Sequence, residues 1–373
     1  MRVVEVRLAQ RSYRIRIGRG LLEQVGPECG RLDLGRRCAV ISDRRVAPHY
    51  AAATLDSLSA NGFDPVLIRI PAGERAKSLR IVQTCYDQLA SHRLERKSFV
   101  VALGGGVVGD LAGFVAATYL RGIPFVQVPT TLLAQVDSSV GGKVGVNLAA
   151  GKNLVGAFHQ PRLVLCDLAT LDTLPLRELR AGISEIIKYG IIYDRKFFGQ
   201  LERDLPQLLE RDEKVLEHVV ARSCAIKAEV VSQDETETGL RAILNFGHTI
   251  GHALEASSGY GKYLHGEAIS LGQVAAARIS SAQMGLAQDD VDRIERLLAV
   301  AGLPVRVRLN PAALDRVFGA MRLDKKVSGG EIKFVLARRI GQVEFGQKVP
   351  ETVIRGVAQS LAEPRGSTSR SAP

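Results

Sequence analysis

Three of the seven histidines, His248, His252 and His265, fall in one short stretch of the chain. His248 and His252 are four residues apart, so on a helix both imidazoles project from the same face, as two ligands of one divalent metal must. The spacing is that of a zinc-peptidase helix, but Thr249 occupies the position where a peptidase needs its glutamate base. The pattern predicts a metal site without a hydrolytic base; the alternative is a set of histidines bonded to neighbouring carbonyl groups.

A glycine-rich segment, residues 104–110, follows a strand-like apolar run and precedes a helical pattern. Glycines at such a turn let backbone N–H groups approach a pyrophosphate, whose charge the helix N-terminus favours. The segment differs from the usual dinucleotide-binding pattern, because it does not follow the first strand and no acidic residue ends the next one, residues 125–128. Asp43, at the end of an earlier strand, is the acidic candidate for a ribose.

Charged residues also occur in the apolar, helical half. Glu185 and Lys188 lie three residues apart in an aliphatic segment, where a lone ion pair is the simpler explanation. Because charges are costly to desolvate, two of them on such a helix indicate a lined cavity. Other polar residues accompany glycine turns and helices: Arg121, Asp137, Ser138, Ser139, Lys143, Lys152, Asn153, Lys227, Arg241, Asn245, Lys325 and Lys326. So many cationic groups suit a ligand with a phosphate and a carboxylate.

The elements that must position these residues follow two patterns. Up to about residue 175, short apolar runs alternate with helical patterns, which predicts an α/β domain with a Rossmann-like parallel sheet covered on both faces. The expected strands are residues 38–42, 65–70, 98–103, 125–128 and 163–166, with helices over residues 50–60, 79–92 and 107–117.

Residues 176–362 are expected to form a mainly α-helical domain. The expected helices are residues 181–192, 213–233, 243–256, 267–284 and 290–301, followed by a hairpin of residues 331–337 and 342–345 and a helix over residues 351–361. Residues 363–373 are rich in Ser, Pro and Arg and predict a disordered tail.

Composition suits a two-domain enzyme of 373 residues, with 46% hydrophobic and 24% charged residues. The N-terminus alternates apolar and charged residues like a strand rather than a signal peptide, and glycines interrupt the most apolar window, so no membrane span is expected. The five cysteines lack C-x-x-C spacing, which indicates reduced thiols in the cytoplasm. The formal charge of +11 favours a small anion over nucleic acid, because the basic residues are dispersed and tryptophan is absent.

Several motifs, taken in order, carry a family resemblance. They are residues 71–78, 104–110, 129–143, 151–153, 184–190, 245–252 and 265–267, reading PAGERAKS, GGGVVGD, PTTLLAQVDSSVGGK, GKN, SEIIKYG, NFGHTIGH and HGE. Together they resemble the 3-dehydroquinate synthases, sugar phosphate cyclases of the shikimate pathway and aromatic amino acid biosynthesis, from about Asp43 to Lys326. Ser184 departs from the alanine that is common in the family, and the tail after Leu361 is not part of the pattern.

The resemblance changes the expected metal ligands. Spacing alone favours His248, His252 and His265, whereas the resemblance implies Glu185, His248 and His265 as ligands of Zn²⁺ or Co²⁺. One carboxylate and two imidazoles leave positions open for substrate oxygens. His252 is then left for the substrate, and Glu267 is a candidate for orienting a ligand.

The resemblance also implies that NAD lies between the two domains, beside the substrate. The cofactor residues would be Asp43, Gly73, Glu74, Lys77, Gly105, Gly106, Val107, Val108, Gly109, Asp110, Thr130, Thr131, Asp137, Ser138, Lys143, Lys152, Thr170, Leu171, Asp172 and Thr173. The substrate would meet Arg121, Asp137, Lys152, Asn153 and Lys326, together with the catalytic set Lys143, Lys188, Lys227, Arg241, Asn245 and His252. A one-residue slip would exchange Lys326 for Lys325.

The implied reaction converts 3-deoxy-D-arabino-heptulosonate 7-phosphate into 3-dehydroquinate in a homodimeric enzyme. Oxidation by NAD acidifies a C–H bond, phosphate leaves by β-elimination after accepting the proton itself, and re-reduction, ring opening and aldol closure follow. NAD returns unchanged, so the enzyme is a lyase. Two alternatives stay open: a cyclase whose substrate lacks the carboxylate, and a metal-dependent alcohol or polyol dehydrogenase that releases NADH.

Overall fold

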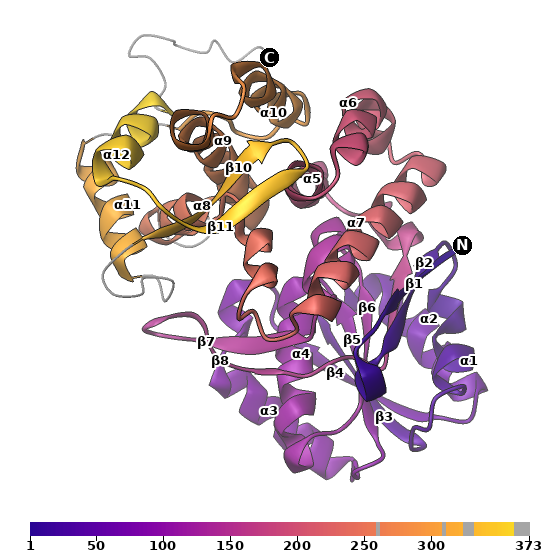
Figure 1. The fold of residues 1–373 in the computed structure, drawn as a ribbon. Helices are drawn as coiled ribbons and strands as arrows, with labels where there is room; N and C mark the ends of the chain where they lie inside the picture. The colour runs from indigo at the N-terminus through magenta and orange to yellow at the C-terminus, as the bar shows by residue number, and fades with distance from the viewer. Residues whose placement is uncertain (259–261, 308–310, 324–331, 362–373) are drawn as a thin grey trace, which may run out of the picture. The chain divides into compact units, whose positions relative to one another are not determined.

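The first half of the chain forms a seven-stranded sheet, in the order β1-β2-β9-β6-β5-β3-β4 (Figure 1). The computed structural model describes residues 1–258, 262–307, 311–323 and 332–361. The strands are β1 (Arg2–Val6), β2 (Tyr13–Gly18), β3 (Arg37–Asp43), β4 (Asp64–Ile70), β5 (Phe99–Gly104), β6 (Phe125–Pro129) and β9 (Leu163–Asp167). All neighbouring strands are parallel except β1 and β2. The predicted parallel sheet is confirmed; β1 lies in the N-terminal segment whose alternation resembled a strand, and β2 was not predicted.

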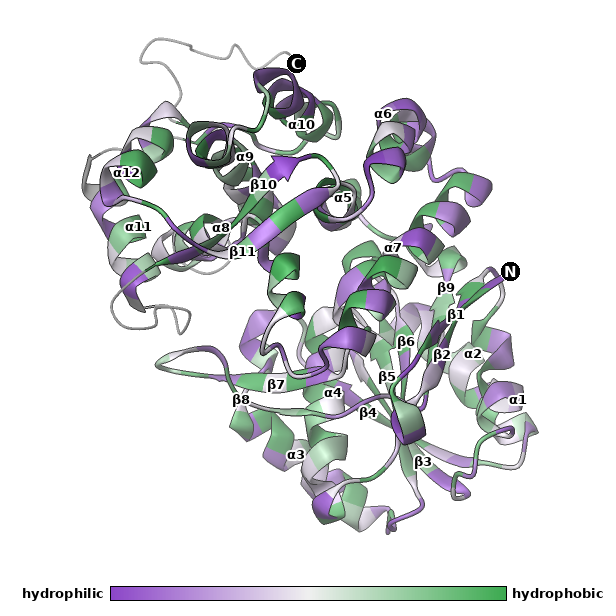
Figure 2. Cartoon of the chain, in the orientation of Figure 1, coloured by the Kyte–Doolittle hydropathy of each residue, from purple (hydrophilic) through white to green (hydrophobic). Residues whose placement is uncertain are grey.

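Apolar side chains fill both faces of this sheet. Ala39 and Ile41 of β3 join a core under α3 (Leu79–Ser91) and α4 (Gly106–Thr118), whereas the alternate residues Cys38 and Val40 join a core under α1 (Val25–Cys29) and α2 (Ala47–Ala60). Strands covered on both faces read as nearly continuous apolar runs, and Figure 2 shows them as mostly hydrophobic. This explains why short apolar runs predicted their positions correctly.

One hairpin and the placement of one helix in this unit differ from the sequence prediction. Strands β7 (Lys143–Leu148) and β8 (Gly151–Phe158) form an antiparallel hairpin that was not predicted. Helix α7 (Glu213–Gln233) packs on β1, β2 and the π-helical turn η5 (Ala134–Ser138), although the prediction assigned it to the helical domain. One compact unit therefore comprises Met1–Gly182 with Glu210–Thr236, and the other comprises Ile183–Leu209 with Glu237–Pro373. A single boundary near residue 175 stays a prediction.

After residue 175 the chain is mainly helical, as predicted. The further helices are α5 (Leu176–Ile192), α6 (Arg195–Leu209), α8 (His248–Ser257), α9 (His265–Met284), α10 (Gln288–Val300), α11 (Pro311–Leu323) and α12 (Glu351–Ser360), and the hairpin is β10 (Lys333–Arg339) with β11 (Gln342–Lys348). Helices α6 and α11 were not predicted, and the helix predicted from residue 243 begins at His248, after a 3-10 turn, η7 (Leu240–Asn245). The predicted tail and the pair Lys325 and Lys326 lie outside the described residues.

None of the helices in the described ranges has the length and apolar character needed to cross a membrane.

Candidate active site

The histidine cluster depends on a close crossing of α8 and α9. Gly247, just before α8, has a φ of 80°, a left-handed conformation that favours glycine. A Cβ atom at Gly272 in α9 would overlap the carbonyl oxygen of Gly247 and lie 2.8 Å from the nitrogen of Gly251. Small residues on both helices therefore let the two backbones touch, which brings the first residue of α9, His265, beside α8.

This crossing leads to the first prediction, for Gly272→Ala. Because backbone atoms block the new methyl group, the helices must separate, and we expect unfolding to become easier by about 1–3 kcal/mol. Urea denaturation measures the change. Gly319→Ala is the control, because Gly319 lies in α11 with nothing within 4 Å of its Cβ position, and alanine there should stabilise by about 0.5–1 kcal/mol. Equal stability of Gly272→Ala and the unmodified protein would contradict the crossing.

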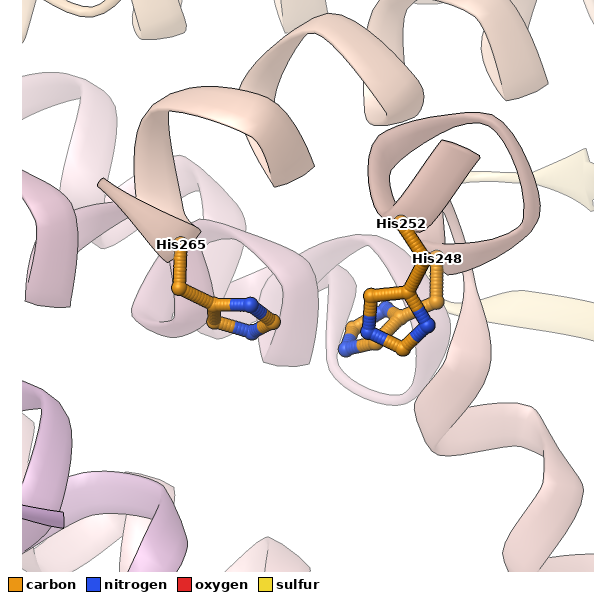
Figure 3. Close-up of side chains that lie close together, drawn as sticks. All are labelled: His248, His252 and His265. Carbon is orange, nitrogen blue, oxygen red and sulfur yellow. The ribbon is translucent and has the colours of Figure 1, made fainter. Parts of the chain in front are cut away.

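His248, His252 and His265 come together as the spacing predicted (Figure 3). Each offers a ring nitrogen, and these three atoms lie within 4.8 Å of one another. His248 and His252 project from one face of α8, and their ring centroids are 5.1 Å apart. The ring of His265 lies 5.6 Å from that of His248. Imidazole nitrogens this close together are suitable ligands for a divalent metal such as zinc.

Glu185, on α5, is the carboxylate of this cluster. Its Oε1 atom lies 3.7 Å from Nε2 of His248 and 3.6 Å from Nε2 of His265. Two ligand atoms of one tetrahedral zinc are about 3.4 Å apart, since each bond is about 2.0–2.2 Å long. Glu185 is fully buried and its other oxygen, Oε2, pairs with the ammonium of Lys188, which leaves Oε1 directed at the histidines.

The second ring nitrogens of two histidines also face acceptors. Nδ1 of His248 lies 3.2 Å from the carbonyl oxygen of Phe246, and Nδ1 of His265 lies 3.5 Å from Oε2 of Glu255. A proton on Nδ1 leaves the Nε2 lone pair for a metal. The Nε2 atoms are those that face Glu185, so the geometry suits the ligand set Glu185, His248 and His265.

Electrostatics at His265 favour a charged ring in the metal-free protein. Burial alone would lower the pKa of His265, but hydrogen bonds and charge from Glu185 and Glu255 raise this pKa to about 9. A metal needs the neutral imidazole, so its binding displaces a proton at neutral pH.

Most predicted cofactor residues lie at or just after the carboxyl ends of parallel strands, whereas Lys143 and Lys152 lie in the antiparallel β7–β8 hairpin. The chain passes from β3 outward to β4 and then returns to β5 on the other side of β3. Ligands of open α/β sheets bind at such a reversal, outside the carboxyl ends of the strands. Asp43 ends β3, residues 73–77 follow β4, residues 105–110 follow β5, residues 130–138 follow β6 and residues 170–173 follow β9. The topology thus brings five separate segments to one edge of the sheet.

The glycine turn packs tightly at this edge. A Cβ atom at Gly105 would lie 3.1 Å from the Thr131 methyl group, and one at Gly106 would lie 2.9 Å from the Ser138 hydroxyl. Helix α4 begins at Gly106, so its unpaired N–H groups and the positive end of its dipole point out of the turn. The hydroxyl of Thr130 is buried, with no hydrogen-bond partner in the part of the chain that the structure describes. Such a backbone cradle suits an anion.

Lys77 connects this edge to the β7–β8 hairpin. Its Nζ atom lies 2.6 Å from Oδ2 of Asp110 and 2.6 Å from Oδ1 of Asn153, and 3.9 Å from Glu74. Lys152 lies 4.0 Å from the same Glu74 carboxylate. Burial raises the pKa of Asp110, against the opposing effect of Lys77. Residues predicted for cofactor and for substrate therefore form one network.

Lys227 and Asp137 also meet. Nζ of Lys227, on α7, donates to the backbone oxygen of Asp137 at 2.7 Å and to its Oδ1 at 2.6 Å. Both were predicted site residues. Helix α7 thus contributes to the sheet unit a lysine that the domain prediction placed elsewhere.

Other predicted residues have structural contacts. Asp43 accepts from the N–H groups of Arg45 and Val46 at the start of α2. Thr170 donates to the Asp167 backbone, Asp172 pairs with Arg19, and Thr173 contacts the Tyr50 hydroxyl. Ser42, which the sequence did not single out, has a buried hydroxyl with no hydrogen-bond partner among the described residues. Its position beside Asp43, at the end of a buried strand, was the available signal.

The remaining predicted substrate residues vary in exposure. Arg241 in η7 is only 2% exposed, and Nδ2 of Asn245 donates to Oε1 of Glu237 at 2.6 Å. Arg121 and Lys143 are exposed in the sheet unit. Lys326 lies outside the described residues.

The sequence of this chain is similar to enzymes of one known family. Residues 67–181 match the family model for the 3-dehydroquinate synthase N-terminal domain, and residues 182–327 match that for the C-terminal domain. The 3-dehydroquinate synthase of Desulforamulus reducens is 50% identical over 357 residues, covering 96% of this chain and 99% of the relative.

Two solved structures of cyclases are also similar. 2-Deoxy-scyllo-inosose synthase, complexed with carbaglucose-6-phosphate, NAD⁺ and Co²⁺, is 29% identical with a TM-score of 0.87, covering 96% of this chain and all of that one. 2-Epi-5-epi-valiolone synthase from Streptomyces hygroscopicus, with NAD⁺ and Zn²⁺ bound, is 29% identical with a TM-score of 0.86, covering 95% of this chain and 98% of that one.

Proposed function

The chain belongs to the 3-dehydroquinate synthase family, and on that premise we propose that it converts 3-deoxy-D-arabino-heptulosonate 7-phosphate into 3-dehydroquinate and phosphate. The net reaction eliminates phosphate, so the enzyme is a lyase. The observation that carries the proposal is the meeting of Glu185, His248 and His265, three residues from three separate family motifs. Oε1 of Glu185 lies 3.7 Å and 3.6 Å from the Nε2 atoms of His248 and His265, and the two histidines have ring nitrogens within 4.8 Å of each other.

Glu185, His248 and His265 are the residues proposed to hold Zn²⁺ or Co²⁺. When bound, the metal supplies a Lewis acid for the substrate oxygen that becomes a ketone. Lys188 holds the second oxygen of Glu185, so the carboxylate presents Oε1 alone to the histidines. His252, left over from the ligand set, is proposed to exchange a proton with the substrate, because histidine titrates near neutral pH.

The carboxyl edge of the sheet is proposed to hold NAD. Bound there, NAD supplies a transient hydride acceptor and returns unchanged. The Gly105–Gly106 turn, which Thr131 and Ser138 approach closely, is assigned to the pyrophosphate because it opens helix α4, whose first N–H groups have no partner within the helix.

The lysines around this edge, together with Asn153, are proposed to hold the substrate anions. Lys152, Asn153 and Lys227 are already oriented by Glu74, Lys77 and Asp137, so little ordering cost remains when a phosphate binds. A held phosphate can accept the proton itself, which removes the need for a separate strong base.

The decisive experiment mixes the metal-loaded protein with 3-deoxy-D-arabino-heptulosonate 7-phosphate and a substoichiometric amount of NAD. Released phosphate together with 3-dehydroquinate supports the proposal. No phosphate release under these conditions would refute it.

A second prediction concerns NAD as a recycled cofactor. Phosphate release should continue for many turnovers per NAD, while the near-ultraviolet absorbance of NADH stays flat. NADH that accumulates in proportion to product would favour the alcohol or polyol dehydrogenase instead. Asp43→Ala should weaken NAD binding and leave the bound metal unchanged.

We further propose a cytoplasmic homodimer without a nucleic-acid partner. All five cysteines are buried and unpaired, which suits a reducing compartment. Light scattering of the purified protein tests the dimer, and a monomeric mass at working concentration would contradict it.

A further inference from the structure

Glu255 is a mostly buried carboxylate next to the histidine cluster. Its side chain is 12% exposed, and its Oε2 atom lies 3.5 Å from Nδ1 of His265. Glu255 lies on α8 and His265 on α9, so the contact joins the two helices that carry the histidines. Burying a carboxylate costs free energy unless a partner compensates it, and His265 is such a partner.

The ring of His265 lies between two carboxylates. Nε2 is 3.6 Å from Oε1 of Glu185, and Nδ1 is 3.5 Å from Oε2 of Glu255. A neutral imidazole carries one proton and one lone pair, and an ionised carboxylate can only accept. A metal bound at Nε2, the nitrogen near Glu185, would leave the single proton of the neutral ring on Nδ1, where Glu255 can accept it, so Glu255 supports this tautomer.

The other charged candidate for this role caps the start of α9. Glu267, which the sequence suggested, accepts from the backbone N–H of Leu264 at 2.8 Å, in the first turn of α9. The Nδ1 atom of His248 faces a neutral partner instead, the carbonyl oxygen of Phe246 at 3.2 Å. A carboxylate raises the basicity of an imidazole more than a carbonyl does. We therefore expect the metal affinity of His265 to depend more on its neighbouring residue than the metal affinity of His248 does.

We propose that Glu255 is a positioning residue for the metal: it fixes the orientation and tautomer of His265 and increases the affinity of that ring for the ion. The proposal rests on the metal assignment of the proposed function. It assigns to Glu255 a role in metal binding that a carboxylate needed only for folding would not have.

The test is a titration of metal-free protein with Co²⁺, followed by visible absorption, using variants at Glu255. We expect Glu255→Ala to weaken Co²⁺ binding by about 10- to 100-fold and to shift the visible bands. Glu255→Gln should lose only part of the Co²⁺ affinity, because an amide oxygen still accepts a hydrogen bond from Nδ1 of His265. The control is Glu295→Ala, which removes a partly buried carboxylate that lies 2.6 Å from Arg278 of α9, and it should bind Co²⁺ normally.

Folding of each variant is checked by circular dichroism and thermal unfolding. The proposal is wrong if folded Glu255→Ala keeps the Co²⁺ affinity and spectrum of the unmodified protein and His265→Ala loses the metal. If Glu255→Ala does not fold, the same unchanged result in Glu255→Gln overturns it. Normal Co²⁺ binding by His265→Ala would instead overturn the metal assignment, and the role of Glu255 with it.

Discussion

Replacing His265 by alanine is expected to remove the bound metal and to lower phosphate release by about a thousandfold or more, which corresponds to about 4 kcal/mol of transition-state stabilisation. The histidine contributes its Nε2 atom, 3.6 Å from Oε1 of Glu185, to a cluster that spans α5, α8 and α9. Metal analysis and phosphate assays on the same preparation measure both losses. Dialysis against a strong chelator should have the same effect, and added Zn²⁺ or Co²⁺ should restore turnover.

His265 is a better target than Glu185 for this test. Glu185 is fully buried and paired with Lys188, which is 1% exposed. Removing one partner of a buried ion pair typically lowers the free energy of unfolding by about 3–5 kcal/mol. A loss of metal from Glu185→Ala could therefore not be distinguished from misfolding. The side chain of His265 is 31% exposed, so its truncation leaves the rest of the cluster in place.

His252→Ala separates the two possible ligand sets. If Glu185, His248 and His265 bind the metal, this variant keeps its metal and loses turnover. If His248, His252 and His265 bind the metal instead, His252→Ala loses the metal, as His265→Ala does. Full activity of metal-free His265→Ala would refute both sets.

The secondary structure was predicted correctly where the sequence pattern favoured one type of element. Strand β5 is buried along its whole length, and its short apolar run, followed at once by glycines, favours a strand over a helix. Strand β8 alternates between exposed and half-buried residues and contains glycines, so its pattern resembles a loop. Helix α7 has a clear helical period, but the period does not identify the surface on which the helix packs, and that surface is the sheet.

The site was predictable in its residue types and less so in its contacts. The spacing of His248 and His252 on α8 identified a histidine cluster that could hold a metal, but no local pattern connects these residues to Glu185, which is distant in the chain. That connection came from the family resemblance. The network of Lys77 with Asp110 and Asn153 joins α4 and the β7–β8 hairpin, and long-range hydrogen bonds of this kind leave no periodic signal in the sequence.

The identity of the sugar phosphate depends on Arg241 and Asn245. We expect 3-deoxy-D-arabino-heptulosonate 7-phosphate to be preferred over sedoheptulose 7-phosphate, which lacks the carboxylate, by a factor on the order of a thousand or more in kcat/KM. A site that hydrogen-bonds a carboxylate rejects the analogue without it, because its own polar groups are then left unpaired. Arg241 is only 2% exposed, so the loss of such a partner would be costly. Comparable kcat/KM values for the two sugars would move the chain to the cyclases whose substrates lack this group.

Arg241→Ala should narrow this preference, mainly by lowering kcat/KM for the carboxylate substrate, since the removed interaction is one that sedoheptulose 7-phosphate never made. Arg241→Lys is the matched variant: it keeps the charge but loses the planar, two-pronged donor geometry, so it should recover only part of the preference. The alternative is that Arg241 serves the fold alone. Its loss would then destabilise the protein and lower kcat/KM for both sugars by the same factor, leaving their ratio unchanged. Measuring both ratios beside the unfolding midpoint of each variant distinguishes the two roles, because only a carboxylate-binding arginine changes the ratio.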